Sequence, residues 1–194
     1  MEKERLAAFV DAVIAIIITI MVLELKVPHE PTLQALMQMG PIFLSYVLSF
    51  IYLGIYWNNH HHFFQLARRV NGAVLWANIH LLFWLSLVPF ATAWMGENHF
   101  APVPMAVYGV SLLMPAIAWY IMQTLVIRML GQDSDFARAI GRDFKGKASP
   151  FLYAAGIASA FVSPWLSGGL YVLVAAMWLI PDRRMERAVE AKKP

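Results

Sequence analysis

The sequence contains no cysteine and few charged residues. The absence of cysteine among 194 residues excludes disulfide frameworks, thiol redox chemistry and thiolate metal sites. Charged residues make up only 14% of the chain and hydrophobic residues 60%, with a mean hydropathy of +0.59. This leaves too little polar surface for a soluble globule. We therefore predict an integral membrane protein in contact with the lipid bilayer, and no nucleic-acid partner, because the net charge of only +3 is explained by where the bases lie.

Motifs of the common catalytic and metal sites are also missing. The chain has no His-Glu-x-x-His and no Gly-x-Ser-x-Gly segment. The only histidine cluster is His60-His61-His62. Consecutive positions on a helix are turned by about 100°, so these three rings cannot grip one ion. We predict no enzyme, no catalytic residues, no metal site and no cofactor.

The sequence also lacks the filter motif of common potassium channels and the buried acidic residues of ion-coupled transporters. No Thr-Val-Gly-Tyr-Gly filter occurs, and no acidic residue lies at the middle of an apolar segment, where it would couple an ion. However, Pro89 and Pro115 interrupt the third and fourth apolar segments, as prolines do in many transporters. A pore built from side chains is favoured, and a secondary transporter of a small solute, with or without proton coupling, stays open as the alternative.

The apolar segments predict an all-α integral membrane protein with six transmembrane helices in a single domain covering residues 1–194. Residues 148–181 carry no charge and as one straight helix would be about 50 Å long, too long for a bilayer. Two short spans fit better, with the turn at Ser163-Pro164 and Gly168-Gly169. Five spans, with one long tilted helix, remain the alternative. The six expected spans are 6–25, 41–64, 72–95, 103–127, 149–164 and 168–181.

The basic residues predict the orientation. With six spans, every lysine and arginine except Lys26 falls on one side of the membrane. Basic loops stay in the cytoplasm, so both termini should be cytoplasmic and the protein should cross the plasma membrane several times.

The first apolar segment carries a possible pore lining. Ile16, Thr19, Ile20 and Leu23 are spaced i, i+3, i+4 and i+7, so they form one stripe on a helix. Around a symmetry axis the stripe would give apolar rings beside a threonine ring, and such a constriction can gate by dewetting. Ordinary helix packing produces the same spacing. Asp11 is turned about 140° from Ile16 and should face neighbouring helices as an anchor.

The same segment carries a longer motif. It reads Arg5, then three residues, then Phe9-Val10-Asp11, and an Ala-Val-Ile-Ala-Ile-Ile-Ile-Thr stretch follows. Further characteristic residues lie in the second and third segments: Ser45-Tyr46, Tyr56-Trp57, Asn59-His60-His61, Asn78, Pro89-Phe90 and Thr92. In these features the chain resembles a bacterial member of the family of the lysosomal potassium channel transmembrane protein 175, closely over about the first 95 residues.

This resemblance implies a potassium-permeable, weakly to moderately potassium-selective channel, assembled as a homotetramer around the first helix, which lines the central pore. K⁺ and related monovalent cations would be the permeating ions. By position, Ile16 matches the family's constriction, Ile20 and Leu23 match further apolar layers, and Thr19 matches a pore-facing hydroxyl.

The resemblance also implies a polar network that ties the first helix to the second and third. Its expected members are Arg5, Asp11, Trp57, His61 and Asn78. The chain departs from the family signature at one position, since Val10 stands where the signature has serine.

Overall fold

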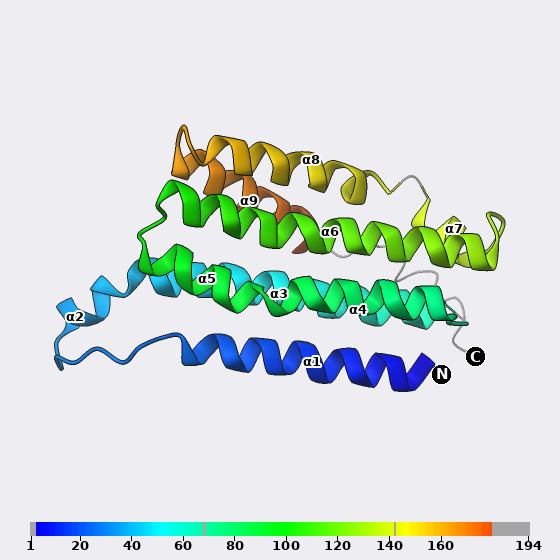
Figure 1. Ribbon diagram of the computed structural model, residues 1–194, viewed down its shortest axis with the longest axis horizontal. Helices are drawn as coiled ribbons and strands as arrows, with labels where there is room; N and C mark the ends of the chain where they lie inside the picture. The colour runs from blue at the N-terminus through cyan, green and yellow to red at the C-terminus, as the bar shows by residue number, and fades with distance from the viewer. Residues whose placement is uncertain (1–2, 68, 142, 180–194) are drawn as a thin grey trace.

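The computed structural model describes residues 3–67, 69–141 and 143–179, and the described residues form nine α-helices (Figure 1). Their bounds are α1 Lys3–Leu23, α2 Leu33–Gln38, α3 Gly40–Leu66, α4 Gly72–Ser86, α5 Val88–Glu97, α6 Pro102–Leu130, α7 Asp135–Ile140, α8 Phe144–Ser159 and α9 Pro164–Leu179.

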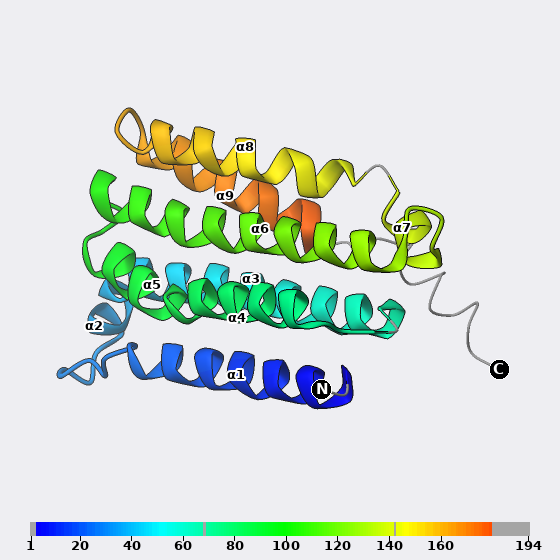
Figure 2. The ribbon, with the colours of Figure 1, turned by 45° about the vertical axis from the view of Figure 1, so that its right-hand side comes forward.

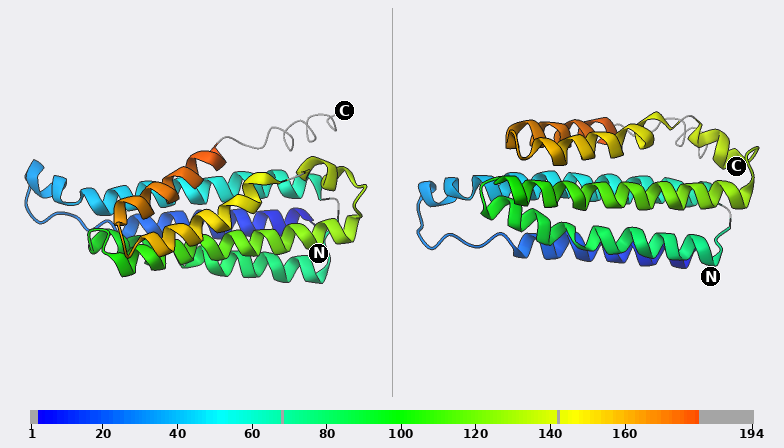
Figure 3. Two further views of the ribbon diagram at one scale, coloured as in Figure 1. Left: turned by 90° about the horizontal axis from the view of Figure 1, so that it is seen from above. Right: turned by 45° about the horizontal axis from the view of Figure 1, so that its top comes forward.

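The long helices run side by side in layers. Helix α1 lies with α4 and α5 at one edge, α3 and α6 form the middle, and the α8–α9 hairpin covers the opposite edge (Figures 2 and 3). Helix α1 packs against α3, α4 and α5, and the long segment through α2 joins it to α3. Because α1 is at the edge, one of its faces has no neighbour within the chain.

Four helical segments are long and apolar enough to cross a membrane. They are Glu4–Leu23, Gly40–Leu66, Gly72–Glu97 and Pro102–Leu130, and as helices they coincide with the first four expected spans to within a few residues. The third consists of α4 and α5, which meet at Leu87. Pro89 lies in the first turn of α5 and lacks the N–H that a continuous helix would bond, which explains the break.

The uncharged stretch after the fourth span forms the α8–α9 hairpin, so the alternative of one long helix is wrong. The turn lies at residues 160–163, and the expectation that Gly168-Gly169 belong to the turn is also wrong, since both are inside α9. Pro164 begins α9, where its fixed φ suits a helix start. Each helix has 16 residues, or about 24 Å, less than the ~30 Å of a bilayer core. The end of the expected sixth span, 180–181, is outside the described residues.

Two apolar cores hold the helices together. The first joins α1, α3, α4, α6 and α7, and the second joins α3, α5, α6, α8 and α9. The second contains buried hydroxyls that bond one another: Ser49 Oγ lies 2.6 Å from Thr92 Oγ1 and 2.9 Å from the Tyr108 hydroxyl. A bilayer offers no water to such groups, so these internal bonds fix the helices against each other.

Candidate functional site

Helix α1 has one buried and one open face. Leu6, Val10, Ile14, Ile17 and Met21 are almost fully buried against the neighbouring helices. They recur every three or four residues, as expected for one face of a helix. The buried face fixes the rotation of α1 about its own axis, and hence which residues it presents outward.

The expected pore stripe lies on the open face. Ile16 is 55% exposed, Ile20 45% and Leu23 77%, and Thr19 is exposed between them. None of the four serves as core packing within the chain, so the packing interpretation of this stripe does not hold for a single chain. Arg5 is exposed near the start of the same helix.

Thr19 is the one hydroxyl on the stripe. Its hydroxyl donates a hydrogen bond to the backbone carbonyls of Ile16 at 2.9 Å and Ala15 at 3.0 Å. A hydroxyl oxygen also has two acceptor lone pairs. Because the proton is held by the helix backbone, the oxygen can present these lone pairs outward to a cation.

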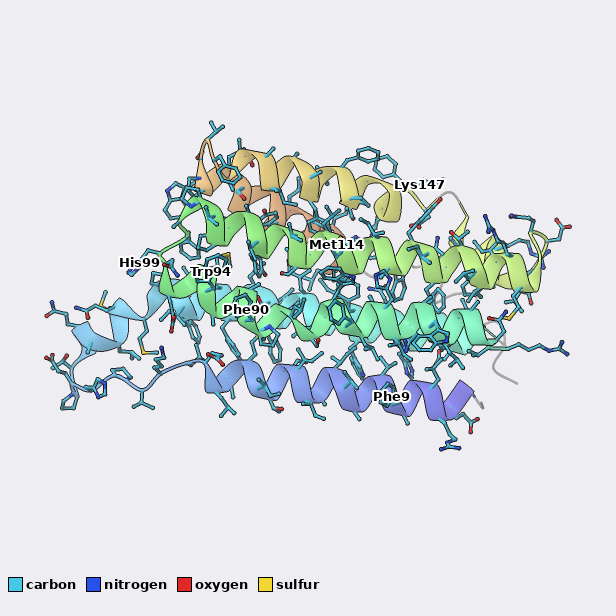
Figure 4. All side chains as sticks on the ribbon, viewed as in Figure 1. Phe9, Phe90, Trp94, His99, Met114 and Lys147 are labelled. Carbon is cyan, nitrogen blue, oxygen red and sulfur yellow. The ribbon has the colours of Figure 1, made fainter. Side chains whose placement is uncertain are left out.

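A groove runs beside the stripe between α1 and the α4–α5 segment. Ile16 and Ile20 line it from α1, and Phe90 and Trp94 line it from α5. The two aromatic rings stack with centroids 6.0 Å apart and mark the α5 wall in Figure 4. This groove continues the apolar surface of the stripe onto a second helix.

Acidic side chains lie at the end of the groove. Glu24 and Glu97 both line it, and Lys26 Nζ contacts Glu97 Oε1 at 2.5 Å. The hydrogen bond and charge of Glu97 raise the pKa of the Lys26 ammonium, so Lys26 is a cation at neutral pH. The pair joins the segment after α1 to the end of α5.

The polar network uses a different histidine from the one expected. His60 Nε2 lies 2.8 Å from Asn78 Oδ1, and both side chains are buried, which joins α3 to α4. Asp11, half-buried on α1, interacts electrostatically with His60. The structure thus places His60 against Asn78, while His61, the expected member of the network, lies elsewhere on α3.

The remaining expected members lie outside this cluster. His61 is exposed, stacks on Trp57 with ring centroids 6.4 Å apart, and its Nε2 accepts from Gln65 Nε2 at 2.7 Å. Arg5 is exposed, and no hydrogen bond or ion pair links it to Asp11 among the described residues. The side chains of Trp57 and His61 therefore form an outward pair near the end of α3.

The three histidines of the triplet have three different partners. His60 points to Asn78, His61 to Gln65, and His62 Nδ1 lies 2.9 Å from the carbonyl of Asn58. Within the part of the chain that the structure describes, no group of three or more potential ligands is placed to hold a metal ion.

Comparisons with known proteins agree with this arrangement. The model of the family described as "Endosomal/lysosomal potassium channel TMEM175" matches residues 5–89, which include the open face of α1 and the His60–Asn78 pair. A protein of Chryseobacterium sp. (strain P1-3) named as a potassium channel is 54% identical over 190 residues, covering 98% of this chain and 99% of the relative. A potassium channel of Streptomyces collinus is 32% identical over 90% of each chain.

A solved structure shares the fold. The crystal structure of a lysosomal potassium-selective channel TMEM175 homolog from Chamaesiphon minutus matches with a TM-score of 0.81 and 31% identity, over 93% of this chain and 97% of that one. The human endosomal/lysosomal proton channel TMEM175 is 31% identical over 103 residues, which are 47% of this chain and 20% of that protein. This is a family of ion channels and not of enzymes. The chain belongs to the TMEM175 channel family and is of the bacterial type.

Proposed function

We propose that this chain is one subunit of a homotetrameric potassium channel of the plasma membrane, with α1 of each subunit around the central conduit. The relatives of nearly full coverage are named as potassium channels, which supports conduction of K⁺ over the alternative of a secondary transporter. The observation that carries the proposal is the open face of α1, where Ile16, Thr19, Ile20 and Leu23 stay exposed among the described residues. K⁺ is the permeating ion, and no cofactor takes part.

The composition of that face favours a shared axis over contact with lipid. Large apolar side chains are stable against either a neighbouring subunit or lipid tails. Against lipid tails the free lone pairs of the Thr19 oxygen would meet neither a donor nor a cation. In a tetramer, Ile16 would form the narrow apolar ring, with Ile20 and Leu23 as further layers and the Thr19 oxygens as ligands to a passing ion.

The topology of the proposed subunit has six membrane-crossing helices with both termini cytoplasmic. The four long spans are supplemented by the α8–α9 hairpin, whose helices cross by thinning the bilayer locally or by packing deep in the tetramer. An even number of crossings keeps all bases but Lys26 on the cytoplasmic side, as the distribution of positive charge requires.

Flux measurements on the purified chain test this function. We expect liposomes that contain the chain and are loaded with K⁺ to release it without added valinomycin, once a counterion can move to balance the charge. Efflux of Rb⁺ should be slower than that of K⁺, and efflux of Na⁺ slower still. Flux should rise linearly with the number of channels and should not require a proton gradient. Flux that saturates steeply with substrate, or that depends on such a gradient, would instead identify a coupled transporter.

Thr19 offers a test of selectivity. Thr19→Val keeps the shape of the side chain but removes the oxygen, so the ratio of K⁺ to Na⁺ flux should fall by about threefold to tenfold, because losing one ion ligand costs ~1 kcal/mol. Reversal potentials under bi-ionic conditions measure this ratio. Thr124→Val is the matched control, since Thr124 on α6 donates to the carbonyl of Tyr120 at 2.8 Å in the same way but lies far from α1. Equal ratios in both variants would remove Thr19 from the conduit.

A further inference from the structure

A second site lies on the side of the subunit away from α1. A cavity opens between α3, α6, α8 and α9, close to the residue at which α8 begins. Of these helices, α8 and α9 form the edge of the bundle opposite α1 in Figure 1. The cavity gives about 40 Å³ to the centres of water-sized molecules, which is room for about three waters or one small organic ligand.

Aromatic rings form most of the cavity wall. They come from all four helices: Tyr52, Tyr56, Trp119, Tyr120, Tyr153 and Trp178. The face of an aromatic ring attracts a cation, most strongly when water is excluded. A wall of this kind suits an ammonium group carrying a short alkyl chain better than it suits an anion.

A carboxylate lies in the same wall. Asp143 precedes α8 and holds a left-handed backbone conformation, with φ +39, that a non-glycine residue rarely adopts. Its Oδ1 accepts from the backbone N–H of Gly146 at 3.0 Å, and its Oδ2 accepts from Gln123 Nε2 at 2.9 Å. Both of these donors are neutral. A carboxylate can accept about four hydrogen bonds, so two positions remain for a ligand.

Two neutral acceptors accompany the carboxylate. Asn59 donates through Nδ2 to the carbonyl of Ile55 at 2.8 Å, which leaves its Oδ1 able to accept. Tyr56 also lines the cavity, and a tyrosine hydroxyl can accept a hydrogen bond. An ammonium group of a primary amine has three N–H donors, which matches the three acceptors from Asp143, Asn59 and Tyr56.

Helix capping alone does not account for these features. The caps of α2, α4 and α7 are the neutral residues Thr32, Asn71 and Ser134, so α8 does not need a charged residue there. Capping also does not require unfilled space lined by aromatic rings. Gln123 is seven residues, or about 10 Å, from the end of α6, which places the carboxylate near the membrane surface, where a charge and a water-borne ligand are both accessible.

We propose that this cavity binds a small protonated primary amine, with its ammonium group on Asp143, Asn59 and Tyr56 and its alkyl part against the aromatic wall. The amine can be free in the cytoplasm or can be the ethanolamine headgroup of a phospholipid, which has the same chemistry. The site is separate from the α1 face and does not depend on the proposed conduit.

Calorimetric titration of the purified full-length chain with ethylammonium tests the site at constant ionic strength. Saturable binding is expected, and ethanol, a neutral molecule of nearly the same size, should not bind. Asp143→Asn should weaken binding at least tenfold, because it removes the charge while asparagine still caps a helix well. Tyr56→Phe removes one acceptor and should weaken binding about threefold.

Asp133→Asn is the matched control, since Asp133 is exposed in the loop before α7. The affinity of this variant for ethylammonium should equal that of the unmodified chain. Repeating the titration in nanodiscs of phosphatidylethanolamine and of phosphatidylcholine distinguishes the two sources. Weaker binding in the former identifies the headgroup as the occupant, and equal binding identifies a free amine. No saturable binding, or equal affinity in Asp143→Asn and Asp133→Asn, would overturn the proposal whatever the ion flux shows.

Discussion

Replacing Ile16 with asparagine should raise K⁺ flux through reconstituted liposomes by about tenfold, which corresponds to ~1.4 kcal/mol off the barrier to permeation. In the proposed tetramer, four Ile16 side chains enclose a narrow apolar passage that water leaves readily, and an ion cannot cross a dry passage. Asparagine is similar in size but binds water, so the ring would stay wet. Ion-flux assays and single-channel recordings measure the change.

The fold should tolerate this substitution. Ile16 is more than half exposed, and exposed positions usually change stability by less than ~0.5 kcal/mol. Ile79→Asn is the matched control, because Ile79 is similarly exposed on α4 but lies outside the proposed conduit. A similar rise in both variants would indicate general leakage. Unchanged flux for Ile16→Asn in a correctly assembled tetramer would contradict the constriction at Ile16.

The membrane spans could be predicted because hydropathy and length are properties of local sequence. The four long segments follow directly from the requirement for about 20 apolar residues per crossing. The turn between α8 and α9 could not be placed as well. Proline and glycine both mark turns in water-soluble proteins, but in α9 Gly168 continues the helix, and a methyl group added to it would lie 3.6 Å from the end of the Met105 side chain, while Pro164 begins the helix.

Which side chains face outward and which are buried could be predicted on α1 but not on α3. The outward stripe of α1 contrasts with a strongly buried face, and both obey the helical period. Helix α3 is apolar on opposite sides, with Phe43 and Phe50 exposed and Leu53 and Phe63 buried. The apolar pattern of α3 therefore does not show which of its faces is buried. Which of the adjacent histidines points to the core changes when the helix is rotated by one residue. A useful signal is that His60 lies seven residues after Leu53, two full turns along the buried side.

His60 and His61 provide a direct test of that rotation. His60→Phe should lower the free energy of unfolding by about 2 kcal/mol, because it leaves the buried Asn78 Oδ1 without its partner in a region that lacks water. Asn78 Nδ2 is already without a partner among the described residues, so no other group there can compensate. The loss should appear as a lower melting temperature in detergent and as fewer assembled oligomers on size-exclusion chromatography, since the pair joins α3 to α4.

The adjacent residue supplies the control. His61→Phe is the same chemical change one position along, but His61 is exposed and bonds only to Gln65, four residues along its own helix, so its melting temperature should change little. The reverse order, with His61→Phe the more damaging, would show that His61 anchors α1 in the assembled channel and that the His60–Asn78 pair is replaceable. If His60→Phe assembles normally but loses K⁺ preference alone, the pair acts on conduction and its role in stabilising the assembly is wrong.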